Sequence, residues 1–277
     1  MKIGKKTKLT ICILLLFILL ALPYELLWGK LFIYSPIKIG FTKHDLPNII
    51  VYTQTGADNC KLESIDSLIH TVENFHHLRF AEKPEIFFFK DAENYHRLTT
   101  TKARFCAYPN GSLVISPWAV KESYNGTISM EIYLWHELSH TLLYQHMNIL
   151  TAYLFYPRWL LEGIAVYSTN QMGTSWYPSK LDTYKYIQQG SFMPPAYFNT
   201  KKENDVKLKI NNKSAFAYSE FACKVDFLII SYGKERFMNY MVELLDSWKP
   251  ESVFKDTYGI DFETCLNNFR KYVDEQK

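Results

Sequence analysis

The chain has 277 residues, of which 48% are hydrophobic and 16% aromatic, so it can form one substantial core or two small ones. This composition excludes a disordered chain, a collagen-like repeat and a small disulfide scaffold. The net charge is +3, but Lys2, Lys5, Lys6 and Lys8 all precede the first apolar run. The rest of the chain is nearly neutral, which excludes the basic surface expected of a protein that binds nucleic acid.

The first thirty residues have the pattern of a transmembrane signal anchor. Residues Leu9–Tyr24 contain no charge, and a helix extended to Gly29 would be about 31 Å long, close to the thickness of a hydrocarbon core. The flanking lysines predict a cytoplasmic N-terminus and an extracytoplasmic body. A cleaved signal peptide would make the body a secreted protein, but the segment lacks the small residues of a cleavage site. A buried core helix is a third alternative.

Residues 35–277 follow the anchor of residues 1–30 without a repeat or a long linker, which predicts a single domain. Hydrophobic periodicity gives its elements in chain order. They are strands at Asn48–Thr53, Glu85–Lys90 and Ser112–Ser116 with helices at Leu62–His77 and Ala92–Thr99 between them, and then helices at Ile128–Met147, Trp159–Thr169, Ser179–Gln188, Tyr218–Tyr232, Lys234–Leu245 and Phe262–Val273. Strands first and helices afterwards indicate an α+β fold with a small sheet.

The predicted helix Ile128–Met147 contains the sequence His136-Glu137-Leu138-Ser139-His140. Residues four apart lie on one helical face, so both imidazoles can bind one metal ion. Glu137 is placed to take a proton from a water on that ion. Zinc suits this arrangement because it accepts nitrogen and oxygen ligands tetrahedrally and leaves its fourth position open to water. A surface pair of histidines is the alternative, which the largely apolar character of this helix disfavours.

Glu162 is the candidate for a third ligand. It lies in a second apolar helical segment, Pro157–Tyr167, and 21 residues separate it from His140. A carboxylate there would complete a His-His-Glu set. The alternative is an acid that complements the dipole at a helix N-terminus.

The sequences H-E-L-S-H and P-R-W-L-L-E-G-I-A-V-Y together resemble the gluzincin metallopeptidases. The likeness is to the compact peptidase MA-like domain and, more distantly, to aminopeptidase N-like and thermolysin-like enzymes. It implies a zincin-like fold with one zinc ion on His136, His140 and Glu162, and Glu137 as the general base of peptide hydrolysis. By the same resemblance Tyr218 would stabilise the oxyanion; a core or surface role is its alternative.

Strand Ser112–Ser116 is expected to be the edge strand along which an extended substrate pairs. Asn110-Gly-Ser-Leu-Val stands where aminopeptidases carry G-x-M-E-N, so an endopeptidase is preferred. Val166 stands where thermolysin-type enzymes place an aspartate that orients a histidine, so the partners of the ligand histidines are not identified.

The resulting hypothesis is a membrane-anchored, extracytoplasmic zinc peptidase that acts on a peptide or protein substrate. Its alternative is a catalytically silent domain that binds a peptide or protein in its cleft. Export would make Cys60, Cys106, Cys223 and Cys265 candidates for disulfide bonds, with three possible pairings, and buried thiols are the other interpretation.

Overall fold

One mixed sheet contains the five strands found in residues 5–57 and 62–276, the part of the chain that the computed structural model describes. Its order is β1-β2-β3-β5-β4. The strands are β1 (Phe41–Asp45), β2 (Ile50–Gln54), β3 (Glu85–Phe88), β4 (Phe105–Ala107) and β5 (Ser112–Ile115). The three central strands run parallel, and β1 and β4 close the edges in antiparallel orientation.

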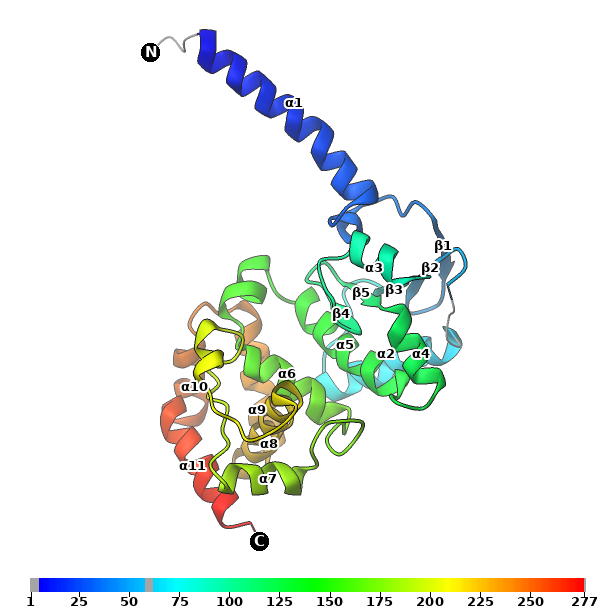
Figure 1. The fold of residues 1–277 in the computed structure, drawn as a ribbon. Coiled ribbons are helices and arrows are strands. Elements are labelled where there is room, and N and C mark those ends of the chain that lie inside the picture. Colours follow the sequence, from blue (N-terminus) through cyan, green and yellow to red (C-terminus); the bar gives the residue numbers. More distant parts are fainter. Residues whose placement is uncertain (1–4, 58–61, 277) are drawn as a thin grey trace.

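Helices cover the sheet and form the rest of the body (Figure 1). Around the sheet lie α2 (Leu62–His76), α3 (Ala92–Leu98), α4 (Pro117–Tyr124) and α5 (Met130–Gln145). The later part consists of α6 (Arg158–Ser168), α7 (Lys180–Gln188), α8 (Lys213–Tyr232), α9 (Lys234–Glu243), α10 (Pro250–Tyr258) and α11 (Phe262–Asp274). Between them are the 3₁₀ turns η3 (Lys201–Asp205) and η4 (Leu244–Asp246) and the π-helical turn η2 (Thr151–Phe155). The α+β architecture predicted from the sequence is confirmed.

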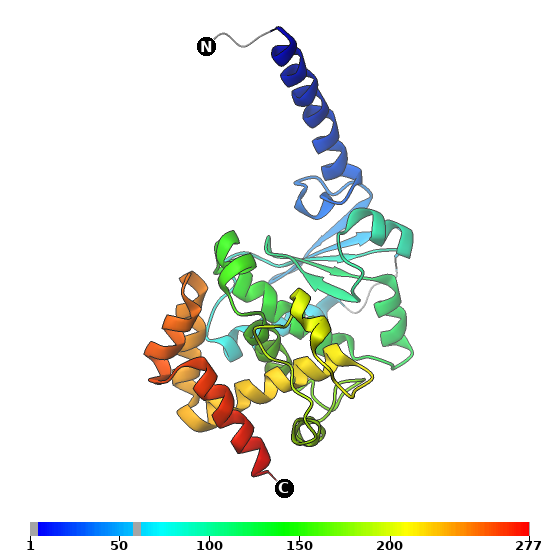
Figure 2. The ribbon, with the colours of Figure 1, turned by 60° about the vertical axis from the view of Figure 1, so that its left-hand side comes forward.

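Helix α1 (Lys5–Trp28) projects away from the body and joins it through the 3₁₀ turn η1 (Phe32–Tyr34) (Figures 1 and 2). In the described part of the chain, no helix is both long enough and apolar enough to cross a membrane. Residues 1–4 of the predicted cytoplasmic flank lie outside the described residues, as do the side chains of residues 5–9, 11–16 and 18. The anchor at residues 1–30 and the domain boundary at residue 35 stay predictions.

The alternating side chains of the central strands supply two cores. Phe87 and Val114 face a cluster built with η1 and α3, whereas Phe88 and Ile115 face α2 and α5. Such period-two burial on both faces is typical of a covered sheet. A third and larger cluster holds the helices from α6 to α11 together.

Helix α5 lies between the sheet and the helical part of the body. Its residues Leu138 and Leu142 belong to the core beneath the sheet, while Leu143 and Tyr144 belong to the core of the later helices. Helix α5, which contains His136 and His140, is therefore fixed on two sides by packing.

Helices α6 and α8 approach each other closely at Gly163. A Cβ atom at this position would lie 2.8 Å from the carbonyl oxygen of Phe221 and 3.1 Å from Cγ2 of Val225. Glycine thus permits a crossing in which the backbones of the two helices nearly touch. The preceding residue is Glu162, so this crossing also sets the position of that carboxylate.

The predicted edge strand Ser112–Ser116 is wrong in its position within the sheet. Strand β5 pairs with β3 on one side and with β4 on the other, so β4 is the edge strand. A tight turn causes this arrangement: the N–H of Tyr108 donates to the carbonyl of Ser112 at 2.8 Å, and Gly111 adopts a φ of 82°. The turn folds Phe105–Ala107 back onto the outer side of β5.

Several short elements were not predicted, namely β1, β4, α4 and α10. Helix α8 also begins at Lys213, five residues before the predicted start at Tyr218. Asn212 caps it by accepting a hydrogen bond from the N–H of Ala215 at 3.1 Å, a signal that the lysine-rich composition of this segment concealed.

Three of the candidate cysteines form no disulfide with one another. Cys223 and Cys265 are buried thiols and Cys106 is half-buried. Cys60 lies outside the described residues.

Candidate metal centre

Two imidazoles converge on the inner face of α5. His136 and His140 are both buried, and their Nε2 atoms lie 3.1 Å apart. The helix that carries them begins at the cap Ser129, whose hydroxyl accepts a hydrogen bond from the N–H of Ile132. The one-turn spacing predicted from the sequence therefore places both ring nitrogens at one point.

Glu162 reaches the same point from α6. Its Oε2 atom lies 3.4 Å from Nε2 of His136 and 3.4 Å from Nε2 of His140. Ligand atoms about 2.0 to 2.1 Å from a tetrahedral zinc ion are separated from each other by about 3.3 to 3.4 Å. The donor atoms and their spacing therefore fit a zinc ion. Within the described residues no other group of histidine, cysteine or acidic side chains comes together in this way.

The three side chains are also coupled electrostatically. Burial alone would raise the pKa of Glu162, but the two imidazoles, His140 foremost, hold it well below its usual range. Burial would lower the pKa of His136, yet the carboxylates of Glu162 and Glu137 raise it above its usual value. The buried carboxylate therefore favours a positive charge at this point, which a bound divalent cation would supply.

Gln171 orients one of the two histidines. Its Oε1 atom lies 2.8 Å from Nδ1 of His136 and can accept a hydrogen bond from an N–H at Nδ1. In that tautomer Nε2 is unprotonated, and its lone pair is free to bind a metal ion. By contrast, Nδ1 of His140 is buried without a hydrogen-bond partner among the described residues. Val166, four residues after Glu162, is apolar and cannot supply one. The sequence analysis missed Gln171, because it lies in the loop after α6 at no recognisable spacing from the histidines.

Glu137 points to the edge strand instead of joining the three ligand candidates. Its Oε2 atom accepts a hydrogen bond of 2.8 Å from the N–H of Ala107 on β4. Glu137, the candidate base, is thus held in place by the backbone of β4.

A cleft of about 550 Å³ contains these groups. Its walls are β4, the metal centre and several aromatic residues, of which Tyr133 and Trp176 line the side next to β4. Tyr218, predicted at this site, is present: its ring stacks on that of His136 with centroids 6.3 Å apart. Burial raises its pKa well above the ordinary value, and the nearby carboxylate of Glu162 adds to the effect.

Tyr177 is a further tyrosine in the cleft, and it was not predicted from the sequence. Its ring centroid lies 6.3 Å from that of Tyr218, and burial, followed by the neighbouring Tyr133, raises its pKa well above the ordinary value. Four tyrosines thus line the cleft, Tyr133, Tyr144, Tyr177 and Tyr218, and sequence alone could not choose them from among 20 tyrosines.

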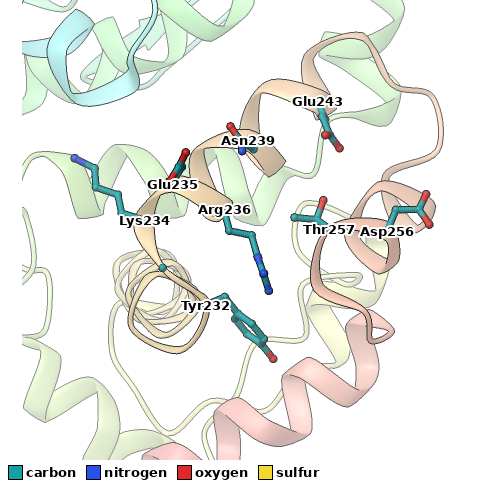
Figure 3. Close-up of a pocket in the computed structure, with 9 residues that line it drawn as sticks. Tyr232, Lys234, Glu235, Arg236, Asn239, Glu243, Asp256 and Thr257 are labelled. Carbon is teal, nitrogen blue, oxygen red and sulfur yellow. The ribbon is translucent and has the colours of Figure 1, made fainter.

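A larger cavity, of about 720 Å³, lies elsewhere on the molecule (Figure 3). Tyr232 and Arg236 line it from one side and Asp256 and Thr257 from the other. Its charges are mixed, and none of its residues belongs to the convergent metal-ligand group. The smaller cleft, which contains the convergent group, is therefore the candidate functional site.

No protein-family model and no curated relative matches the sequence. Among solved structures, the chain is similar to a mutant M1 zinc metallopeptidase from Deinococcus radiodurans, with a TM-score of 0.49, 11% identity, and coverage of 86% of this chain and 53% of that one. A second structure of the M1 zinc metallopeptidase from Deinococcus radiodurans gives a TM-score of 0.49, 12% identity, and coverage of 84% and 52%. The chain spans about half the length of these structures.

Proposed function

We propose that the protein is a zinc-dependent peptidase. The observation that supports this most directly is the convergence of His136, His140 and Glu162 at 3.1 to 3.4 Å beside a further carboxylate, Glu137, in one cleft. Zinc bound by the first three would lower the pKa of a water molecule and polarise a carbonyl oxygen.

Glu137 performs the proton transfers in this proposal. Its carboxylate accepts a proton from the attacking water and returns it to the leaving amine. The hydrogen bond from Ala107 to one carboxylate oxygen holds the group toward the cleft, so that little reorganisation precedes the transfer. The hydroxyl of Tyr218 donates a hydrogen bond to the oxygen on which negative charge develops.

An extended substrate would pair with β4. Residues 103–107 line the cleft, and among the described strands only β5 pairs with β4. The outer backbone groups of an edge strand can add another chain by main-chain hydrogen bonds. Substrate pairing is therefore assigned to β4 in place of the Ser112–Ser116 strand expected from the sequence.

The composition of the cleft favours an endopeptidase. Glu137 and Glu162 are the only carboxylates among its lining residues, and the proposal uses both of them at the reacting centre. None of the other lining residues offers a negative charge to hold the free amino group of a substrate, so the substrate would extend through the cleft in both directions.

The proposed location of the body outside the cytoplasm rests on the sequence of the first thirty residues. The lysines before Leu9 and the uncharged run after them are typical of a segment with a cytoplasmic N-terminus. Alkaline extraction of membranes and protease treatment of intact cells test this. A protein that is extracted and protected from protease would contradict the location without affecting the proposed chemistry.

Metal analysis and kinetics test the chemistry. We expect about one zinc ion per chain, lost in His140→Ala and retained in Glu137→Gln. Turnover of an unfolded protein substrate should fall by about 10²- to 10⁴-fold in Glu137→Gln, since that is the usual contribution of a general base. Glu131→Gln is the matched control, because Glu131 is an exposed residue of the same helix.

Two results would contradict the proposal. Equal cleavage by Glu137→Gln and the unchanged protein would exclude the assigned base. Zinc binding by the unchanged protein without turnover of a broad peptide library would favour a catalytically silent domain that holds a peptide or protein in its cleft.

A further inference from the structure

An exposed apolar surface follows directly after the helix that carries the metal ligands. We define it by four residues, the 149–154 patch: Ile149, Leu150, Tyr153 and Leu154, with exposed fractions of 68%, 48%, 49% and 69%. Residues 147–157 contain no charged side chain. A contiguous exposed surface of this kind is typical of an interaction site.

The patch is held in place by a defined turn. Asn148 accepts a hydrogen bond of 2.9 Å from the N–H of Thr151 and donates another of 2.9 Å to its hydroxyl. Thr151 and Ala152 are buried in the π-helical turn η2. Because Thr151 and Ala152 pack against the body, the exposed side chains of the 149–154 patch have a fixed position on its surface.

An exposed tryptophan extends the patch. The ring of Phe155 stacks on that of Trp248 with centroids 5.7 Å apart, and Trp248 is 58% exposed. An aromatic ring beside aliphatic side chains is the composition found where protein surfaces enter the interface of a lipid bilayer.

The patch lies at the end of the body from which α1 projects. The bright green turn of η2 is on that side in both views (Figures 1 and 2). The two regions are neighbours: the side chain of Tyr153 lies close enough to that of Tyr34 in η1, the turn that follows α1, to add to the effect of burial in raising the pKa of Tyr34.

Helix α1 itself exposes apolar side chains toward the same end. Leu19, Leu20, Tyr24 and Trp28 are all exposed. One apolar phase could cover both these residues and the 149–154 patch. The uncharged patch offers no ion-pairing groups with which a particular protein partner would be selected.

We propose that the 149–154 patch inserts into the outer interface of a lipid bilayer beside α1, as a second point of membrane contact. This inference rests on the proposed location of the body. Helix α5 ends at Gln145, four residues before the patch, so the contact would fix the orientation of the metal cleft relative to the membrane surface.

The experiment uses the full chain incorporated into vesicles of phosphatidylcholine and phosphatidylglycerol. An environment-sensitive fluorophore is attached to Leu154→Cys and, as a matched control, to Leu181→Cys. Leu181 is 61% exposed on α7, at the end of the body opposite α1 (Figure 1). The unsubstituted chain, treated in the same way, gives the background from the native cysteines.

We expect the emission of the residue-154 probe to shift to shorter wavelength and to be quenched by lipids brominated in their acyl chains. The residue-181 probe should show neither effect. If the chain floats with vesicles while both probes stay equally exposed to water, the patch proposal is refuted and the location stands. If the chain does not associate with vesicles, both are refuted.

A third outcome would also overturn the proposal. Protection of the residue-154 probe from aqueous iodide without quenching by brominated lipid would mean that protein covers the patch, for example a second copy of the chain. The double variant Leu150→Ser/Leu154→Ser should keep its zinc content, because neither residue lines the metal cleft, but should lose the part of vesicle association that the patch provides.

Discussion

Replacement of Gly163 by alanine tests whether α6 and α8 meet at backbone contact beside the metal centre. The added Cβ would lie 2.8 Å from the carbonyl oxygen of Phe221 and 3.1 Å from Cγ2 of Val225, closer than the optimal separation of about 3.5 to 4.0 Å for such atoms. Overpacking costs about 1 to 3 kcal/mol, and contact with a backbone atom, which cannot rotate away, places this case at about 2 to 3 kcal/mol. The higher helix propensity of alanine offsets about 1 kcal/mol.

We therefore expect the free energy of unfolding to fall by about 1 to 2 kcal/mol. For a domain of this size, about 1 kcal/mol corresponds to about 2 to 4 °C in Tm, so calorimetry at saturating zinc should show a decrease of about 2 to 8 °C. Zinc affinity should fall as well, because Glu162 precedes Gly163 and moves with α6.

Val225→Ala provides the control for this prediction. It removes the contact with Cγ2 but leaves the carbonyl oxygen of Phe221 in place, so it should relieve Gly163→Ala only in part when the two changes are compared in a double-mutant cycle. Complete relief would mean that the side chain, not the backbone, sets the approach of the helices. A Gly163→Ala protein as stable as the original would refute the close crossing itself.

Three further predictions concern single side chains. Gln171→Leu should weaken zinc binding by about 10- to 100-fold in a chelator competition, whereas Gln171→Glu keeps an acceptor for His136 and should keep most of the affinity. Lys224→Met leaves the buried carboxylate of Glu220 without its cationic partner and with only the N–H of Met193 as a hydrogen-bond donor, and it should cost about 3 to 5 kcal/mol in denaturant unfolding. Adding Glu220→Leu should recover much of that loss, and additive costs would contradict the coupling. Asp261 caps α11, and a hydrogen bond from the backbone N–H three residues on lowers its pKa. Its stabilisation is present above the usual carboxyl pKa and is lost as pH falls through the lowered value, so Asp261→Asn should flatten the acid limb of Tm against pH, and an unchanged limb would count against the cap.

The convergence of the three candidate ligands could be predicted because local periodicity determines most of their geometry. A spacing of four on a helix places His136 and His140 together whatever surrounds them. Glu162 needed one tertiary assumption, namely that the second apolar helix packs against the first. The two helices do pack together, and the carboxylate lies 3.4 Å from both imidazoles.

The features that were missed depend on contacts between segments distant in sequence. Strand β4 has only three residues, too few for a period-two pattern, and it becomes the edge strand through the turn at Gly111. Gln171 approaches His136 because the chain reverses after α6. Strand β1 contains Lys43, His44 and Asp45, and polar residues of this kind on an edge strand carry no hydrophobic signal.

The metal centre bridges the two main packed regions of the body. Glu162 belongs to a helix whose buried residues Trp159, Leu160, Leu161 and Ile164 are part of the core of the later helices, while the histidine helix also packs beneath the sheet. An ion held by both helices would act as a cross-link between these regions, and its binding energy would add to the stability of the folded state. A newly synthesised chain without metal would be less stable at the boundary between these two packed regions. Its resistance to cellular proteases would then report whether the metal had been acquired.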